Sequence, residues 1–285
     1  MEYVTLSNGM KMPKVGFGVF QVKDPEECVR VVKDAIKVGY RLLDTAQSYG
    51  NEAELGKSVN ESINEGIVTR EELFITTKLW ISNITYEKAK SSMYESLDKM
   101  GLEYVDLVLL HQPLNDVYGA LRGLKELVDE GKVKAVGVSN FYADRIVDIA
   151  HFAAVAPVVN QIEVNPFNAR FDQEEWNQKF NIQLEAWAPF AEGKQGIFTN
   201  PVLKEIGDQY GKSVGQVILR WLVQRNIIPL SKTVKKSRME ENINVFDFEL
   251  SADDMAKITQ LNKDKTSFFD HEDPKSVEML VGLVR

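Results

Sequence analysis

Three ionisable side chains stand where successive apolar segments of the sequence end. Asp44 ends one such segment, Lys78 ends the next, and His111 ends the one after that. Any one of them alone is compatible with a helix cap or with a polar residue satisfied by its neighbours. If the segments are parallel strands of one barrel, all three side chains face the same mouth, where such barrels carry their chemistry. An acid, an ammonium group and an imidazole at one mouth predict acid–base chemistry.

A tyrosine in the loop after Asp44 extends this group. Tyr49 lies within residues 46–52, and a lone loop tyrosine is usually a packing residue. A nearby Lys78 ammonium group is expected to favour the phenolate and to lower the tyrosine pKa from its usual value of about 10. Asp44 would hold Lys78 charged and in place. Tyr49 is therefore predicted to serve as a general acid near neutral pH.

The elements that must position these residues follow from an alternation of β-type and helical patterns. Between the apolar segments lie stretches with apolar residues at helical spacing, which predicts parallel strands joined by right-handed crossovers. The β-type segments are Val15–Gly18, Tyr40–Asp44, Leu73–Thr77, Val105–Leu110, Val133–Val138, Val158–Ile162, Ile182–Ala186 and Ile227–Leu230. Eight units without a long linker predict an α/β fold, a (β/α)₈ TIM barrel, formed by residues 1–285 as a single domain.

Additional elements are expected at both ends of the chain. Residues 3–12, with Asn8-Gly9 in their middle, predict a β-hairpin that closes the bottom of the barrel. Two extra helices are expected after the eighth strand, at about 237–245 and 252–261, followed by an irregular tail. Helix limits are also readable: Asp24 and Pro25 form a start signal, and Gly39, Gly101 and Gly131 are stop signals.

Two glycine motifs are rejected as nucleotide-binding signatures. Gly16-Phe17-Gly18 lacks the third glycine of a Rossmann fingerprint, since position 21 is Gln21. Gly56-Lys57-Ser58 lacks the leading glycine of a P-loop and sits in a helical pattern. The single cysteine, Cys28, excludes an internal disulfide and is expected to be a helix packing residue. His151 and His271 are expected to be structural or exposed.

Composition narrows the function classes. The formal net charge of −8 argues against a nucleic-acid binder. Because no signal peptide and no apolar segment near 20 residues is apparent, no membrane association is expected and a cytoplasmic location is predicted. No metal site is expected. Against the acidic background, Lys232, Lys235, Lys236 and Arg238 form a basic cluster at the entry to the helix after the eighth strand, which predicts a phosphate site.

Several motifs at the predicted strand ends resemble the aldo-keto reductase superfamily, over residues 4 to about 276, and in particular the bacterial branch that includes 2,5-diketogluconate reductases. The matching segments are residues 43–46, 49–52, 76–80, 109–113, 137–141, 160–166 and 238–242. The resemblance implies an NADPH-dependent reductase of aldehydes and ketones, and most relatives of this size are monomers.

The resemblance also implies residue roles. Tyr49 would protonate the carbonyl oxygen, Lys78 and Asp44 would tune it, and His111 would orient the carbonyl. The cofactor, NADPH or NADP⁺, would be bound by Gly18, Val19, Ser139, Asn140, Gln161, Trp187, Ala188, Pro189, Phe190, Lys232, Thr233, Arg238, Glu241 and Asn242. Of these, Ser139, Asn140 and Gln161 would hold the carboxamide, Trp187 would stack on the nicotinamide, and Lys232 and Arg238 would hold the 2′-phosphate. The substrate, a small carbonyl compound, would meet Phe20, Trp80, His111 and Tyr49.

Some positions depart from the family pattern. Trp187 stands where many members have tyrosine, and Ser231 replaces a proline before the phosphate-binding lysine, which puts the rigidity of that loop in doubt. Short loops after His111 and after residue 262 predict an open, permissive pocket. Two alternatives stay open. One is a non-catalytic NADP(H)-binding redox sensor of the same fold. The other is a lyase or isomerase that uses Lys78 as a Schiff base, although an Asp44 partner that keeps Lys78 charged disfavours it. The physiological carbonyl is not encoded in any recognisable motif.

Overall fold

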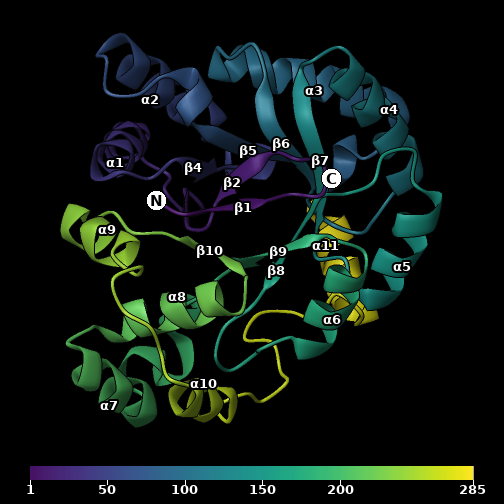
Figure 1. Ribbon diagram of the computed structural model, residues 1–285. Coiled ribbons are helices and arrows are strands. Elements are labelled where there is room, and N and C mark those ends of the chain that lie inside the picture. The colour runs from purple at the N-terminus through teal and green to yellow at the C-terminus, as the bar shows by residue number, and fades with distance from the viewer. Residues whose placement is uncertain (285) are drawn as a thin grey trace.

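The computed structural model describes residues 1–284 and confirms the predicted (β/α)₈ barrel. Within these residues, eight parallel strands close in the order β10-β3-β4-β5-β6-β7-β8-β9 (Figure 1). The strands are β3 Gly16–Gly18, β4 Leu42–Asp44, β5 Phe74–Leu79, β6 Val105–Leu110, β7 Val133–Ser139, β8 Val159–Glu163, β9 Gln183–Trp187 and β10 Ile228–Ser231. Each predicted strand is found, with limits shifted by two residues or fewer.

Helices surround the strands as an outer layer (Figure 1). They are α1 Pro25–Val38, α2 Glu52–Asn64, α3 Tyr86–Met100, α4 Val117–Asp129, α5 Ala143–Phe152, α6 Phe171–Lys179, α7 Pro201–Tyr210, α8 Val214–Gln224, α9 Lys236–Ile243, α10 Ala252–Thr259 and α11 Pro274–Gly282. Short 3₁₀ segments are η1 Gln47–Tyr49, η2 Arg70–Glu72, η3 Ile81–Asn83 and η4 Ala191–Thr199. In the described part of the chain, none of these helices has the length and apolar character needed to cross a membrane.

The predicted helix signals act as expected. The Asp24 side chain accepts a hydrogen bond from the Glu27 N–H at the start of α1, and Pro25 occupies the first turn. Gly39 and Gly101 end α1 and α3 with φ of 117° and 61°. Such left-handed values strain most other residues, so glycine fits both ends.

The predicted hairpin closes one end of the barrel. Strands β1 (Tyr3–Thr5) and β2 (Lys11–Pro13) pair antiparallel and cross the middle of the ring in Figure 1. Val4 and Met12 join a buried cluster with barrel-interior residues such as Leu107 and Leu230. Apolar side chains therefore fill this end of the barrel interior.

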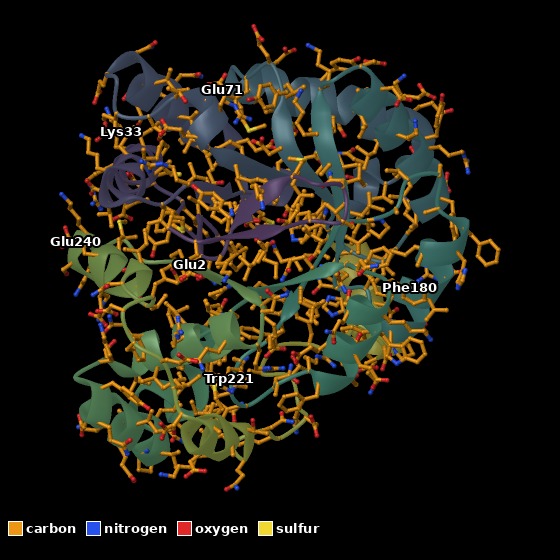
Figure 2. The ribbon with its side chains drawn as sticks, in the orientation of Figure 1. Glu2, Lys33, Glu71, Phe180, Trp221 and Glu240 are labelled. Carbon is orange, nitrogen blue, oxygen red and sulfur yellow. The ribbon has the colours of Figure 1, made fainter. Side chains whose placement is uncertain are left out.

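Side chains fill both the ring and the space between strands and helices, with charged residues such as Lys33 and Glu240 at the rim (Figure 2). The two rejected glycine motifs have packing explanations. A Cβ on Gly16 would lie 2.4 Å from a methyl group of Leu230, inside the barrel. A Cβ on Gly56, in α2, would lie 2.1 Å from the carbonyl oxygen of Met100. Glycine is thus needed for close approach at both positions.

One expectation about the chain end is corrected. The two predicted helices are present as α9 and α10, but the tail expected to be irregular contains α11. Asp273 caps this helix by accepting from the Lys275 N–H, and Pro274 occupies its first turn. The same start signal was recognised at residues 24–25, so the helix was readable from the sequence.

Candidate active site

The strand register brings the three predicted side chains to one mouth of the barrel. Asp44 is the last residue of β4 and pairs with Thr76 of β5. His111 directly follows β6, and its N–H donates to the Leu79 carbonyl of β5. Lys78 does not end its strand, since β5 continues to Leu79. It lies an even number of residues after Phe74, whose side chain is in the barrel-interior cluster, so Lys78 also points inward.

Lys78 is the centre of the hydrogen-bond network at this mouth. Its side chain is fully buried. The ammonium group donates to Asp44 Oδ1 at 2.6 Å, to the Thr45 carbonyl at 3.0 Å and to the Tyr49 hydroxyl at 3.2 Å. These three bonds use its three donors. The predicted tuning arrangement of Asp44, Lys78 and Tyr49 is therefore present as a contiguous chain.

The electrostatics of this chain differ from the expectation in one respect. Burial lowers the pKa of Lys78, but the attraction of Asp44 and Tyr49 outweighs it and the pKa is raised, so the ammonium form persists. Burial also raises the pKa of Tyr49 above its usual range, and Lys78 only partly opposes this effect. The predicted lowering of the tyrosine pKa is thus wrong for this structure, because desolvation of the phenolate outweighs one neighbouring cation.

His111 is neutral at this mouth. Burial lowers its pKa well below 6.5, and the Lys78 charge acts in the same direction. Its ring lies edge-on to Tyr49 and to Trp80, with centroid separations of 5.7 and 5.2 Å. Ser48 Oγ lies 3.4 Å from Nδ1. An imidazole that carries one proton on Nε2 can donate a hydrogen bond into the mouth without carrying charge.

The residues expected to hold a carboxamide gather at the ends of β7, β8 and β9. The Gln161 amide nitrogen donates to Asp44 Oδ2 at 3.0 Å and to Glu185 Oε2 at 2.7 Å. The Asn140 amide donates to the His111 carbonyl at 3.0 Å and accepts from Trp187 Nε1 at 2.9 Å. Ser139 Oγ donates to the Gln161 carbonyl at 2.8 Å. All four predicted side chains are therefore tied to the Asp44–Lys78–His111 group.

Neighbouring backbone completes the mouth. Gly18 lies beside Asp44, because a Cβ there would be 3.9 Å from Oδ1. The Val19 N–H donates to the Asp44 carbonyl at 3.1 Å. Ala188, which follows β9, has φ of 46°, a strained value for alanine that turns the chain at the strand end. Pro189 is buried behind it, and both lie in the turn after Trp187.

The aromatic residues predicted to meet a substrate surround Tyr49 and His111. The Phe20 ring lies 4.9 Å from the Tyr49 ring and is 47% exposed, so it stands at the entrance. Trp80 contacts His111, and Trp187 is partly exposed at the end of β9. Phe20 and Trp80 therefore lie beside the two residues expected to face the carbonyl.

The segment after residue 262 covers more of the mouth than the sequence suggested. Thr266 Oγ1 donates to Glu163 Oε2 at 2.5 Å and the Ser267 N–H donates to Glu163 Oε1 at 3.2 Å, which anchors the segment to the end of β8. Phe268 then packs on Trp187 with centroids 5.1 Å apart. A short segment thus reaches the mouth because the buried Glu163 carboxylate anchors it, and the open, permissive pocket stays a prediction.

Three neighbours of the mouth were not assigned a role from the sequence. Phe268 stands in the pair Phe268-Phe269, an apolar signal inside the tail that was expected to be irregular. His271, expected to be structural or exposed, is buried with Nδ1 3.2 Å from the Tyr142 hydroxyl. Glu185 is a fully buried carboxyl group in the middle of β9. A charged residue inside an apolar strand segment was the signal that could have found it.

The basic cluster lies where the chain enters α9. Lys232, Lys235, Lys236 and Arg238 are all exposed, and among residues 1–284 none of them pairs with a carboxylate. The α9 helix has no side-chain cap, so its first N–H groups remain available to a ligand. Thr233 Oγ1 accepts from the Lys235 N–H at 3.2 Å. Cations together with free helix donors form a donor set suited to a phosphate.

The remaining predicted residues lie between α8 and α9. Glu241 accepts a hydrogen bond from Ser213, the N-cap of α8. A Cβ on Gly215 would lie 3.6 Å from Asn242 Oδ1 and 3.7 Å from Phe190, so these two side chains flank that glycine. Ser231 pairs with Phe17 of β3 in the sheet register, so the loop without its proline is anchored by the barrel.

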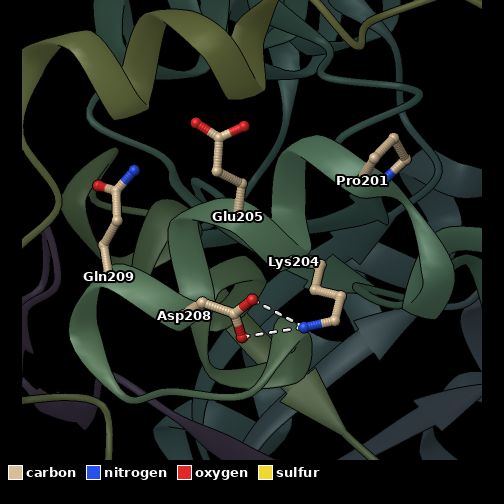
Figure 3. A pocket seen from close by; sticks show the side chains of 5 residues that line it. All are labelled: Pro201, Lys204, Glu205, Asp208 and Gln209. Carbon is tan, nitrogen blue, oxygen red and sulfur yellow. Dashed lines mark hydrogen bonds and ion pairs between the residues drawn. The ribbon is translucent and has the colours of Figure 1, made fainter.

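A hollow in the outer layer carries no comparable chemistry. The hollow in Figure 3 lies on α7 in the outer layer and is lined by Pro201, Lys204, Glu205, Asp208 and Gln209. Lys204 is paired there with Asp208 at 2.7 Å. In the portion of the chain that the structure covers, no cluster of three His, Cys, Asp or Glu side chains is arranged to hold a metal ion.

Comparisons with known proteins point to one family. The family model described as "Aldo/keto reductase family" matches residues 14–263. An uncharacterized oxidoreductase YtbE from Bacillus subtilis is 45% identical, over 91% of this chain and 92% of its own length. A glyoxal reductase from the same organism is 42% identical, over 93% and 94%. A Bombyx mori aldo-keto reductase solved in complex with NADP is 34% identical, with a TM-score of 0.91 over 97% of this chain and 96% of that one.

Proposed function

The chain belongs to the aldo/keto reductase family, and on this premise we propose that it is an NADPH-dependent reductase of small aldehydes and ketones with Tyr49 as its general acid. The observation that carries the proposal is the buried Lys78 ammonium group, bonded both to Asp44 and to the Tyr49 hydroxyl. A buried cation held by one carboxylate is costly to maintain without a function. Here it faces the Tyr49 hydroxyl, which can exchange a proton with a carbonyl oxygen.

The overall reaction consumes one carbonyl compound, one NADPH and one proton, and yields one alcohol and one NADP⁺. When bound, NADPH supplies a hydride to the carbonyl carbon. Tyr49 gives its proton to the carbonyl oxygen, and Lys78 stabilises the phenolate that remains. The raised pKa of Tyr49 keeps the proton in place at neutral pH. Because an alkoxide is far more basic than a phenolate, the transfer is still favourable, and solvent then restores the proton.

Neutral His111 orients the carbonyl. Its pKa is well below 6.5, so it donates a hydrogen bond without adding a second cation beside Lys78. Ser48 can donate to Nδ1 and thereby leave the proton on Nε2. Tyr49 and His111 then present two donors to one oxygen, the arrangement that stabilises negative charge on it.

Three groups of residues would hold the cofactor. Gln161, Asn140 and Ser139 offer amide and hydroxyl groups to the carboxamide once they exchange their present protein partners, and Trp187 offers a ring face to the nicotinamide. Lys232, Thr233 and Arg238 fit the 2′-phosphate, because the cluster has cations without carboxylate partners in the described chain. Gly18, Val19, Ala188, Pro189, Phe190, Glu241 and Asn242 would line the rest of the site. The related Bombyx mori structure in complex with NADP supports the choice of cofactor.

The substrate class follows from the entrance. Phe20, Trp80 and Trp187 provide aromatic surface and no charge, which suits small uncharged carbonyl compounds. The 42% identical relative is named a glyoxal reductase. We therefore include small α-oxoaldehydes among the expected substrates.

The test is NADPH oxidation with a panel of aldehydes, α-dicarbonyls and keto-sugars, for the wild type and Tyr49→Phe. Removing the transferable proton should lower turnover by a factor of about 10² or more. NADPH affinity, measured by fluorescence titration, should hardly change. Tyr94→Phe is a matched control, because Tyr94 lies on α3 at the surface and should keep full activity.

Near-normal turnover by Tyr49→Phe would contradict the assigned acid. A wild type that binds NADPH but turns over no carbonyl of the panel would favour the redox-sensor alternative.

A further inference from the structure

Glu185 is a buried carboxyl group beside the proposed active site that the reaction above does not use. It lies on β9, next to Gln161 of β8 in the sheet register and next to Ile228 of β10. Its side chain is fully buried. Oε2 accepts from the Gln161 amide at 2.7 Å, whereas Oε1 is buried and has no partner among residues 1–284.

Gln161 links this carboxyl to the site. The two N–H groups of its amide nitrogen go to Glu185 Oε2 and, at 3.0 Å, to Asp44 Oδ2. The two carboxyl groups are therefore separated by a single amide nitrogen. Asp44 in turn bonds to Lys78, so the four side chains form one buried polar layer across the mouth of the barrel.

The charge of this layer depends on Glu185. The titratable groups that face it are Asp44 from β4, Lys78 from β5 and the Tyr49 hydroxyl above them. Gln161 from β8 and Ile228 from β10 carry no charge. Because Asp44 and Lys78 cancel, the layer is neutral when Glu185 is protonated and has one negative charge when Glu185 is ionised.

The protonation of Glu185 changes in an accessible pH range. Burial, followed by the repulsion of Asp44, raises the pKa of Glu185 to about 8. The Gln161 hydrogen bond and the Lys78 charge act in the opposite direction but do not outweigh them. Glu185 therefore keeps its proton at neutral pH and releases it in mildly alkaline solution.

We propose that Glu185 discriminates between the oxidised and reduced cofactor by proton release: ionised Glu185 favours the cationic nicotinamide of NADP⁺, and protonated Glu185 favours the uncharged ring of NADPH. The inference rests on the proposed function, in which Gln161 and Trp187 hold that ring. Glu185 bonds to Gln161 and lies two residues before Trp187 on the same face of β9. A cation held by these neighbours must favour the carboxylate form of Glu185.

The expected pH dependence follows from the linkage between NADP⁺ binding and the ionisation of Glu185. If the cation lowers the pKa of Glu185 by one unit, NADP⁺ binding tightens by about tenfold between pH 6 and pH 9, while NADPH binding does not tighten. The 2′-phosphate also titrates, but it is common to both cofactors, so the ratio of the two dissociation constants cancels its effect. NADP⁺ binding should also release a fraction of a proton near pH 7.5.

The experiment is calorimetric titration of the full-length protein with NADP⁺ and with NADPH from pH 6 to pH 9, in two buffers of different ionisation enthalpy. For the wild type, the ratio of the NADPH to the NADP⁺ dissociation constant should rise with pH, and the NADP⁺ heat should depend on the buffer more strongly than the NADPH heat does, because both cofactors carry the 2′-phosphate. Glu185→Gln keeps the shape and the acceptor for Gln161 but cannot ionise, so both effects should disappear. Glu52→Gln is the matched control, because Glu52 is buried outside the barrel interior against Thr77 and Ser96, and it should keep both effects.

If the wild type binds NADPH but the ratio of the two dissociation constants does not change with pH, this inference is overturned and the proposed function is not. That outcome can be read from the wild type alone. A pH trend that survives in Glu185→Gln would overturn it as well. A protein that binds neither cofactor would overturn the proposed function and this inference with it.

Discussion

Lys78 is stabilised in the barrel interior only by its immediate neighbours. A fully buried ammonium group loses its hydration, and Asp44 at 2.6 Å together with two oxygen acceptors replaces it. The same contacts constrain Asp44, which has no other cation partner in the described residues. Removing one member of such a pair therefore affects both the proton chemistry and the stability of the fold.

This coupling gives a prediction for Lys78→Met. Turnover should collapse, because the phenolate of Tyr49 loses its cation, and the free energy of unfolding should fall by about 3 kcal/mol, because a buried carboxylate is left unpaired. The double variant Lys78→Met/Asp44→Asn should regain part of the stability and none of the activity. Urea denaturation and NADPH oxidation measure the two effects. A single variant as stable as the wild type would show that Asp44 is not left unpaired, and a borohydride-trapped adduct on Lys78 would favour the Schiff-base alternative.

Which residues lie at the mouth was predictable, and how they titrate was not. Asp44, Lys78 and His111 were found because strand ends of a parallel barrel must meet. The direction of the Tyr49 pKa shift depends on how much water the packed loop excludes, which no spacing in the sequence records. Glu185 was missed because its neighbours in β9 read as a buried strand. In an interior layer, an isolated carboxyl group is the informative exception to that pattern.

At the level of elements, the strands were predictable because each is a short apolar segment with a turn or cap signal on both sides. The covering of the mouth by residues 263–271 was not, since it depends on contacts distant in sequence. Glu163 anchors the segment through Thr266 and Ser267, and Phe268 meets Trp187. No periodicity indicates such contacts. The start signal of α11 was present, but only Leu280 of this helix is buried, so its apolar pattern is weak.

The basic cluster at the start of α9 leads to a prediction about cofactor choice. Arg238 and Lys232 should each contribute a charge-assisted bond to the 2′-phosphate, worth about 2–4 kcal/mol for the exposed pair, which is roughly a 30- to 1,000-fold preference for NADPH over NADH. Arg238→Ala should weaken NADPH binding by about tenfold or more and leave NADH binding almost unchanged, since NADH lacks that phosphate. Arginine should matter more than lysine because its fork can grip the phosphate with two bonds.

Binding titrations at increasing salt provide the measurement, and the NADPH preference should shrink as screening increases. Lys204→Ala on α7 is the control, because Lys204 already pairs with Asp208 and should affect neither cofactor. Equal losses for both cofactors in Arg238→Ala would indicate a folding defect, and a wild type that prefers NADH would contradict the phosphate assignment.

For the whole molecule, the two ends of the barrel differ in the side chains that fill them. The hairpin end is filled by apolar side chains, whereas the opposite end holds the polar layer of Asp44, Lys78, Gln161 and Glu185. We propose that residues 1–285 unfold as one domain, because these layers share the same eight strands. Buried titratable groups at both ends and in the helix layer should then be released together.

That release predicts how stability varies with pH. Burial raises the pKa of Cys28 from 9.0 to about 12 and those of Tyr40 and Tyr142 from 10.0 to about 12. The stability that these three groups contribute is fully present below their unfolded pKa values and is lost as the pH rises through the folded ones, at about 3 kcal/mol for each tyrosine and about 4 kcal/mol for Cys28. The free energy of unfolding should therefore fall steeply above about pH 9.

Two further groups shape the acid and neutral range. Burial lowers the pKa of His271 from 6.5 to about 4, so its contribution is present above pH 6.5 and lost as the pH falls to 4. The pKa of Glu185, raised from 4.5 to about 8, makes stability decline as the pH rises between those values. Urea unfolding at pH 4.5, 7.5, 9 and 11 should show one transition, and Glu185→Gln should be more stable than the wild type at pH 7.5 by about 2–4 kcal/mol but not at pH 4.5. Above pH 9, the free energy of unfolding of Tyr142→Phe should fall less steeply than that of the wild type. An unfolding free energy that stays level up to pH 11 would mean that water reaches these groups in the native state.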